Sequence, residues 1–230
     1  MKRLLCLAAS LGVLCAAQPA AAATNLIQNG GFEEKVTTSN YQTIRTNREP
    51  LDFGWSVNNS VDVVNLDGFY GGDPDPVGGG TYALDLVGDG ADGGIYQSFN
   101  TEIGKTYRLT FDYAHNPYIQ GASMQFGVSS TGGLAFSRSL SASGSSESGM
   151  NWQTFTIDFV ANRSQSTLFF YNTAGGDRTG MYLDNIAVID PTEPGPVGGI
   201  PEPATWALMI GGFGMAGATL RRKRRFVLAA

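Results

Sequence analysis

The fold class is decided by a ten-residue stretch that alternates large apolar side chains with polar ones: Gly104-Lys105-Thr106-Tyr107-Arg108-Leu109-Thr110-Phe111-Asp112-Tyr113. The apolar members from Tyr107 to Tyr113 fall on one face, and the polar members between them fall on the other. Successive side chains of a β-strand point to opposite faces, so this period of two predicts a strand with one buried face.

The same alternation recurs along the rest of the central region. Phe155, Ile157 and Phe159 lie opposite threonines and an aspartate, and further strands are predicted at residues 82–87, 94–99, 122–128, 134–139, 166–172 and 181–189. Clusters of Gly, Asn, Asp and Ser separate these runs, whereas helical periodicity is hard to find. Two long loops are expected, at residues 66–80 and 141–151. The sequence predicts an all-β, antiparallel sandwich forming one domain over residues 24–190.

The N-terminus has the three parts of a secretory signal peptide. Lys2 and Arg3 precede an apolar segment over residues 4–17, and the small residues Ala21-Ala22-Ala23 follow it as a cleavage site. We expect residues 1–23 to form a signal helix that is removed on export. Both cysteines, Cys6 and Cys15, lie in this segment, so the mature chain would have neither a thiol nor a disulfide.

The C-terminus combines an apolar run with a cluster of cations. Residues 203–220 carry no charge over 18 positions, about 27 Å as a helix at 1.5 Å per residue, which just spans a bilayer core. Five basic residues, 221–225, follow and would stay on the cytoplasmic side. The physical pattern alone fits a transmembrane helix that anchors the protein, with residues 226–230 as a short tail.

The residue order at this C-terminus indicates a more specific role than a membrane anchor. Pro201-Glu202-Pro203, a tryptophan three residues later, a Gly-rich apolar run and an arginine cluster resemble the PEP-CTERM sorting signal in its PEPxxWA variant. The resemblance implies that residues 201–225 are recognised by a membrane transpeptidase of the exosortase type. The protein would be held transiently at the inner membrane, facing the periplasm, and then moved to the cell surface, the outer membrane or the exterior. The residues that carry this signal are Pro201, Glu202, Pro203, Trp206, Arg221, Arg222, Arg224 and Arg225.

The charge between the two terminal segments is strongly negative. Residues 24–200 contain 8 Lys and Arg against 19 Asp and Glu, a net charge of −11, although the whole chain is at −5. Nucleic-acid binding needs basic surfaces, so no nucleic-acid partner is expected. Residues 191–200 are rich in Pro and Gly and are expected to be a linker between the domain and the sorting signal.

The order of short motifs in the central region resembles the galactose-binding-like jelly roll of carbohydrate-binding modules and of the DUF642 group. The motifs are the opening Asn25-Leu26-Ile27-Gln28-Asn29-Gly30-Gly31-Phe32-Glu33, then Gly54-Trp55, the strands at 82–86, 94–99 and 104–111, and the closing Tyr182-Leu183-Asp184-Asn185-Ile186. The resemblance implies a jelly-roll sandwich, flanked here by the signal helix and the transmembrane helix.

The resemblance also implies a structural calcium ion where the opening turn meets the closing strand. Carried over by position, its ligands would be the Glu33 and Asp184 carboxylates and the Gly31 carbonyl. Calcium prefers six to eight hard oxygen ligands, and such an ion would link the first and last segments of a domain without cysteines. The alternative is that Glu33 and Asp184 are ordinary polar residues at strand ends. Asp67, Asp73 and Asp75 fit a solvated turn better than a second cation site.

Polysaccharide binding needs exposed aromatic faces with amide and carboxylate groups beside them. The best exposed candidates are Tyr41, Phe69, Tyr70 and Tyr118, whereas Trp55 and Trp152 at strand starts are expected in the core. His115 has no Ser or Cys in a nucleophile setting, and no phosphate-binding or metal-hydrolase motif occurs. Asp85 and Asp112 lie in strands whose spacing does not bring them together. We therefore expect a non-enzymatic, surface-sorted protein that binds polysaccharide or serves in the exopolysaccharide or biofilm matrix. The alternative is an exported hydrolase or lyase that acts on polysaccharide.

Overall fold

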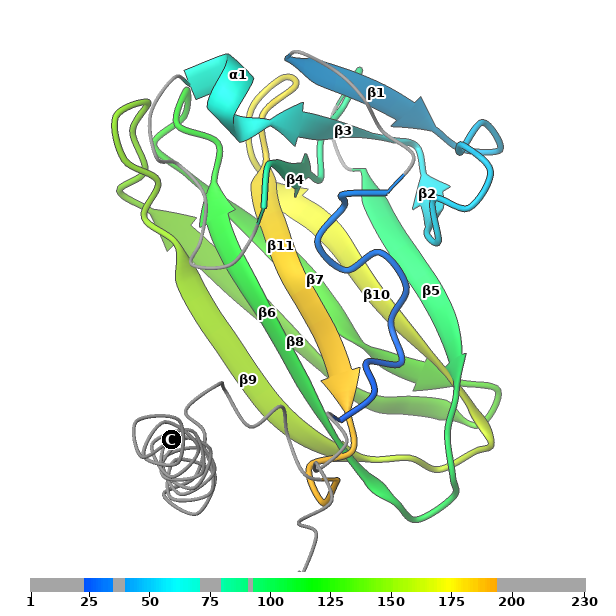
Figure 1. The fold of residues 1–230 in the computed structure, drawn as a ribbon. Helices are drawn as coiled ribbons and strands as arrows, with labels where there is room; N and C mark the ends of the chain where they lie inside the picture. The colour runs from blue at the N-terminus through cyan, green and yellow to red at the C-terminus, as the bar shows by residue number, and fades with distance from the viewer. Residues whose placement is uncertain (1–22, 35–39, 71–79, 91–92, 194–230) are drawn as a thin grey trace, which may run out of the picture. The chain divides into compact units, whose positions relative to one another are not determined.

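The computed structural model describes residues 23–34, 40–70, 80–90 and 93–193 (Figure 1). Residues 23–193 form one compact unit. The predicted signal segment, most of the predicted linker, and the sorting signal with its predicted transmembrane helix lie outside the described residues, as do Asp73 and Asp75. Within the described part, no helix is long and apolar enough to cross a membrane.

Two antiparallel sheets make up the domain, and Figure 1 shows them lying face to face. The first sheet contains, in spatial order, β1 (Tyr41–Arg45), β3 (Ser60–Asn65), β4 (Tyr82–Asp85), β11 (Met181–Ile189), β6 (Thr106–His115) and β9 (Gln153–Val160). The second contains β2 (Ser56–Asn58), β5 (Gly94–Asn100), β10 (Gln165–Ala174), β7 (Gly121–Ser130) and β8 (Gly133–Ser143). The predicted all-β jelly-roll sandwich is confirmed.

The alternating stretch that predicted the fold is β6, and its apolar face lies in the core. Leu109 and Phe111 are fully buried. The Phe111 ring meets Phe126 of β7 and Phe170 of β10 edge to face, with ring centroids 5.0 Å apart in both pairs. Edge-to-face contacts of this kind stabilise beyond the area that they bury. The aromatic residues of β6, β7 and β10 therefore join the two sheets.

The opening motif, residues 25–33, forms hydrogen bonds with the last strand, β11. The Asn25 side chain accepts a hydrogen bond from Val188 N at 3.0 Å and donates one to Ile186 O at 3.2 Å. The Gly30 carbonyl accepts from Ile186 N at 3.0 Å. A Cβ atom on Gly30 would lie 2.0 Å from Ile186 O, so only glycine allows this approach. The first described segment is thereby fixed to β11.

Three local expectations can be compared with the structure. Trp55 is 3% exposed, and its Nε1 donates to Asn29 O at 3.0 Å, as expected for a core residue. The expected loop at 66–80 begins instead with a short helix, α1 (Leu66–Tyr70). The loop predicted at 141–151 begins later in the structure, after Ser143, because β8 pairs with β7 as far as that residue. Strands β1, β2 and β3 were not predicted.

A second, smaller hydrophobic cluster covers part of the outer face of the six-stranded sheet. Its buried members are Val64, Leu66, Ala83, Ala114 and Tyr182, with Met150 and Trp152 packed against them. Trp152 stacks on Tyr182 at 6.4 Å between centroids. This cluster forms one side of the cleft described below.

We predict that Asn25→Ala destabilises the 23–193 unit by about 1–3 kcal/mol, because it leaves buried backbone groups of β11 without their hydrogen-bond partner. Urea unfolding followed by tryptophan fluorescence measures the change. Thr24→Ala, at an exposed neighbouring position, is the matched control. Equal unfolding midpoints for the Asn25 variant and the wild type would contradict the role given to this side chain.

Candidate functional site

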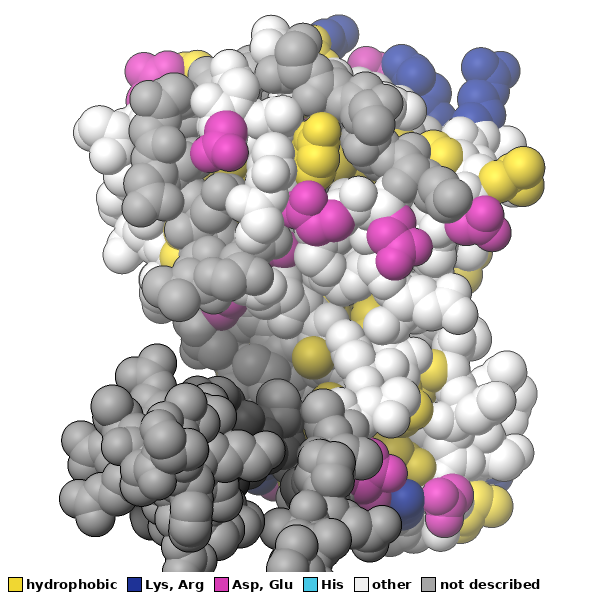
Figure 2. Space-filling model, viewed as in Figure 1, with side chains coloured by type: hydrophobic (Ala, Val, Ile, Leu, Met, Phe, Trp, Pro, Cys, Tyr) yellow, Lys and Arg dark blue, Asp and Glu magenta, His cyan; other side chains and the backbone are white. Residues whose placement is uncertain are grey.

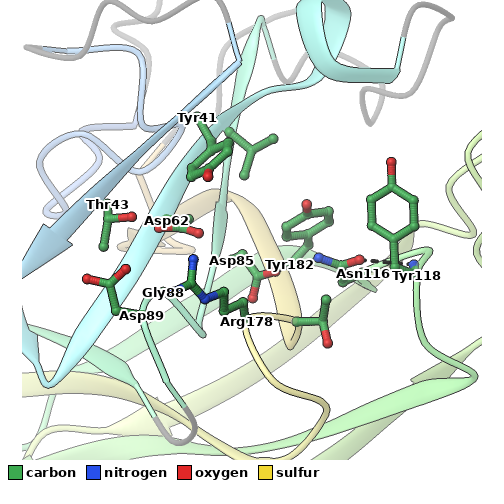
Figure 3. Close-up of a pocket in the computed structure, with 12 residues that line it drawn as sticks. Tyr41, Thr43, Asp62, Asp85, Gly88, Asp89, Asn116, Tyr118, Arg178 and Tyr182 are labelled. Atoms are coloured by element: carbon green, nitrogen blue, oxygen red, sulfur yellow. Dashed lines mark hydrogen bonds between the residues drawn. The ribbon is translucent and has the colours of Figure 1, made fainter.

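A row of side chains crosses the outer face of the six-stranded sheet and forms the floor of a cleft (Figure 3). The register places Thr43 of β1 opposite Asp62 of β3, Asp62 opposite Asp85 of β4, and Asp85 opposite Tyr182 of β11. Directly opposite residues on adjacent strands share one face of the sheet. Backbone pairing alone therefore gathers these four side chains.

The cleft has a volume of about 160 Å³ and a mixed polar and aromatic lining. Besides the row on its floor, the residues that line it are Tyr41, Val64, Gly88, Asp89, Asn116, Tyr118, Arg178 and Thr179. Figure 2 shows acidic side chains gathered in the upper half of the view, the part of the molecule where Figure 1 places β3 and β4.

Asp85 is the most deeply buried acid of the cleft, at 1% exposed. Its Oδ1 accepts a hydrogen bond from Val87 N, and its Oδ2 accepts one from Asn116 Nδ2, both at 2.9 Å. Burial raises the pKa of Asp85 to about 7, and the negative charge of Asp62 acts in the same direction. Asp85 therefore carries a proton in part of the molecules at neutral pH.

Asp62 is 8% exposed, and burial raises the pKa of its carboxyl as well. A hydrogen bond with Thr43 and the positive charges of Arg178 and Arg45 oppose that rise. Within the described residues, the buried Asp62 Oδ1 has no hydrogen-bond partner. Two acids directly opposite each other on neighbouring strands repel, so the arrangement costs stability when both are ionised. A buried acid with a raised pKa in a cleft, such as Asp85, is typical of functional sites.

Basic groups limit the negative potential of the cleft. Figure 3 shows the Arg178 side chain reaching toward the acids on the floor, and its charge lowers the pKa of Asp62. At the rim, Arg45 pairs with Asp89. The cleft thus offers both carboxylates and a guanidinium as hydrogen-bonding groups.

Two exposed tyrosines flank the floor. Tyr41 is 48% exposed and Tyr118 is 54% exposed. The Tyr118 hydroxyl donates to Glu147 Oε1 at 2.6 Å, which raises the pKa of Tyr118 and restricts its ring. Tyr118 N donates to the Asn116 side chain, which also holds Asp85. The ring is therefore tied to the buried acid through one asparagine.

The structure brings together two of the four aromatic candidates, since both Tyr41 and Tyr118 line this cleft. Phe69 and Tyr70 belong to α1, and their side chains lie outside the described residues. Asp85 and Asp112, which the sequence did not bring together, have separate partners: Asp112 accepts hydrogen bonds from Thr154 and Asn185.

Sequence reasoning missed Asp62, Asn116 and Arg178 as site residues. A signal existed for the acids: Asp62 interrupts an apolar run in Val61-Asp62-Val63-Val64, and Asp85 does so in Leu84-Asp85-Leu86. An acid within a buried strand either has a partner or has a function. Their pairing follows from the strand register, which the sequence did not give.

The three proposed calcium ligands are each placed at a strand or turn. Glu33 Oε1 accepts from Thr81 N at 2.7 Å and Tyr82 N at 2.8 Å, and Gly31 lies in the turn before it. Asp184 is fully buried, and its Oδ1 accepts from Asn185 N at 2.7 Å. No cluster of three or more His, Cys, Asp or Glu residues arranged for a metal occurs among the described residues. Two carboxylates fall short of the six to eight oxygens of calcium, so the ion stays a prediction.

His115, at the end of β6, is buried and connects neighbouring segments through hydrogen bonds. It is 1% exposed, its Nδ1 lies 2.8 Å from Asn116 O, and its Nε2 accepts from Ser145 N at 2.8 Å. Because the backbone N–H must be the donor, these contacts fit the tautomer with its proton on Nδ1. The ring joins β6 to the loop after β8.

A family model described as "Protein of unknown function (DUF642)" matches residues 25–189, more than half of the chain. The chain belongs to the DUF642 family. A second model, the PEP-CTERM protein-sorting motif, matches residues 199–225 of this DUF642 protein. Both sequence resemblances are thereby confirmed, and the motif supports export with a membrane-anchored sorting signal. No curated protein matches the chain.

Solved structures similar to this DUF642 chain include several carbohydrate-binding modules. TmCBM61 in complex with β-1,4-galactotriose has a TM-score of 0.48 and 16% identity, covering 73% of this chain and 99% of that one. The CBM22-1 xylan-binding domain of Paenibacillus barcinonensis Xyn10C has a TM-score of 0.42 and 15% identity, covering 75% of this chain and 97% of that one. A family 35 carbohydrate-binding module from Clostridium thermocellum has a TM-score of 0.40 and 16% identity, covering 64% of this chain and 96% of that one. Similarity at this level does not identify a ligand for this chain.

The paired acids make a pH-dependent contribution to stability. The folded pKa of Asp85, about 7, lies above the ordinary value of 3.8, so the folded state holds a proton that the unfolded chain has released. Stability is then lost as the pH rises toward 7, at about 1.4 kcal/mol per unit of pKa shift. We predict that Asp62→Asn reduces this loss, because it removes the neighbouring charge.

The measurement is the thermal midpoint of the 23–193 unit from pH 5 to 7.5. The midpoint of Asp62→Asn relative to wild type should rise with pH across this range. Asp158→Asn is the control, because pairing with Arg108 lowers the pKa of Asp158, and that group titrates below the range. A midpoint difference independent of pH would show that the two acids are not coupled.

Proposed function

We propose that this protein is an exported, non-catalytic sandwich domain that binds polysaccharide through the cleft and acts at the cell surface or in the exopolysaccharide matrix. The observation that carries the proposal is the combination of two exposed tyrosines, Tyr41 and Tyr118, with polar groups between them. Aromatic faces stack on the C–H faces of sugar rings, while carboxylate, amide and guanidinium groups bind the hydroxyls. Asp62, Asn116 and Arg178 supply those groups here.

The cleft is better suited to binding than to bond cleavage. Paired acids with separated pKa values do occur in glycoside hydrolases, and the Asp62–Asp85 pair is what favours the alternative of an exported hydrolase or lyase. However, Asp85 is buried, and each of its oxygens already accepts a hydrogen bond from Val87 or Asn116. Release of reducing or unsaturated chain ends by the wild type, and not by Asp85→Asn, would favour the enzyme instead.

We predict that Tyr41→Ala/Tyr118→Ala weakens binding to the producing cell's own exopolysaccharide at least about tenfold, because two stacking faces are lost. Affinity electrophoresis and a glycan array with the 23–193 unit give the ligand and the affinity. Ile103→Ala, which removes an exposed apolar side chain away from the cleft, is the matched control. Binding of the wild type to no glycan at all would favour a purely structural role.

The sorting route forms the second part of the proposal. An exosortase-type transpeptidase would recognise residues 201–225, and the processed protein would leave the inner membrane. We predict that replacing Pro201-Glu202-Pro203 with three alanines keeps the protein in the inner membrane. Fractionation followed by immunoblotting measures this. Unchanged release of the variant would contradict processing at this motif.

A calcium ion held by Glu33, Asp184 and the Gly31 carbonyl is a further part of the proposal. It would link the opening turn to β11, in addition to the hydrogen bonds of Asn25 and Gly30. We predict that EGTA lowers the thermal midpoint of the 23–193 unit and that added calcium restores it. Glu33→Gln should remove most of the effect. A midpoint insensitive to EGTA would count against a bound ion.

A further inference from the structure

The outer face of the five-stranded sheet carries a band of aromatic rings. Tyr96 of β5 lies directly opposite Phe169 of β10, and Tyr171 follows on the same face. Tyr96 is 39% exposed, and Phe169 and Tyr171 are partly exposed. The Phe169 and Tyr171 rings lie 5.5 Å apart at an angle of 31°. Three neighbouring aromatic side chains thus face outward from a sheet whose other face fills the core.

Glycines on the adjacent strands let two of these rings lie along the sheet. A Cβ atom on Gly94, opposite Tyr171, would lie 2.1 Å from Tyr171 Cδ1, and one on Gly127, opposite Phe169, would lie 3.0 Å from Phe169 Cζ. The rings therefore occupy the space that side chains at these glycines would fill. Tyr96, Phe169 and Tyr171 together form a surface of neighbouring rings on this sheet, the aromatic platform.

Polar but uncharged side chains surround the aromatic platform. Ser98 and Thr167 share a hydrogen bond at 2.8 Å, and Gln125 Nε2 donates to Ser137 Oγ at 3.1 Å. In the five strands of this sheet, the described outward positions contain no Asp, Glu, Lys or Arg. These positions include Ser56, Asn58, Ser98, Asn100, Ser123, Gln125, Ser129, Ser139 and Ser141. This face is uncharged on a domain whose residues 24–200 carry a net charge of −11.

A groove of about 580 Å³ continues from the platform at Tyr96. Gln28, Ser56 and Asn100 are exposed in its lining and offer amide and hydroxyl groups. Its wall is fixed by Gln97, whose side chain bonds to the backbone N and O of Gln28 and to Gly54 O. From β2 to β8 the face is about 19 Å wide, at about 4.8 Å per strand.

We propose that the aromatic platform and this groove form a second binding site, which takes an extended, uncharged polysaccharide chain. Flat rings offer stacking surfaces, and the surrounding hydroxyl and amide groups both donate and accept, as sugar hydroxyls do. The described outward positions of this sheet hold no cation, which disfavours an anionic polymer. The small apolar area, bordered by serines, disfavours a protein partner. The site lies on the opposite sheet from the Asp62–Asp85 cleft, so one domain could hold two chains and cross-link them.

The test uses affinity electrophoresis of the 23–193 unit in gels with a neutral polymer: hydroxyethylcellulose, β-1,4-galactan, arabinoxylan or dextran. Carboxymethylcellulose serves as the anionic counterpart of the first. We expect retardation by at least one neutral polymer and little by carboxymethylcellulose. Tyr96→Ala and Phe169→Ala should each weaken that binding about tenfold, while Tyr96→Phe, which keeps the ring, should retain most of it. Ile103→Ala is the control for unrelated surface changes, and thermal midpoints confirm that each variant folds.

Three outcomes would overturn the proposal. These outcomes are no retardation by any neutral polymer, equal retardation by carboxymethylcellulose, and full affinity in the Tyr96 and Phe169 variants. A dimer that dissociates on Tyr96→Ala, without any polysaccharide binding, would make the face a contact between copies instead. If only Tyr41→Ala/Tyr118→Ala lost affinity, the second site would fail while the proposed function of the cleft would stand. If only the Tyr96 and Phe169 variants lost affinity, the second site would stand while the proposed function of the cleft would fail.

Discussion

The domain depends on the insertion of its last strand into the middle of the first sheet. β11 pairs with β4 on one side and β6 on the other, so it joins β1, β3 and β4 to β6 and β9. The opening segment then fixes β11 through Asn25 and Gly30. Both cysteines precede residue 23, so the domain has no disulfide, and these hydrogen bonds and the aromatic core stabilise it instead. The same strand brings Tyr182 beside Asp85 and completes the floor of the cleft.

The two sheets present opposite chemistry on their outer faces. The six-stranded sheet carries two buried acids side by side, a pairing that costs stability and that packing alone does not require. The outer face of the five-stranded sheet carries rings over glycines among serines, and its described outward strand positions hold no charged residue. A domain that only filled space would need neither arrangement. Under the two proposals, both arrangements serve ligand binding: the paired acids cost electrostatic stability, and the rings of the other sheet are only partly buried.

The sequence predicted those parts of the molecule where one strand face is buried and the other is exposed. β6 and β9 alternate for that reason, whereas β3 does not: Val61 and Val63 face the core, and Val64 faces the second cluster. Tyr41 and Tyr118 could be found because they lie in or beside predicted loops, where aromatic side chains are exposed. Asp62 and Asp85 could not be paired, since their contact depends on strand register. Tyr96, Phe169 and Tyr171 were missed because they lie within predicted strands, whereas the aromatic candidates came from the loops.

The most direct measurement of the central claim is an NMR titration of the isotope-labelled 23–193 unit with oligosaccharides from the producing cell's exopolysaccharide. The account predicts that backbone amide shifts change in the strands and loops of the cleft, around Asp62, Asp85, Asn116 and Tyr118, while amides away from both sheet faces stay unchanged. Saturating amounts of oligosaccharide that leave the spectrum unchanged, or that shift only amides away from both sheet faces, would contradict it.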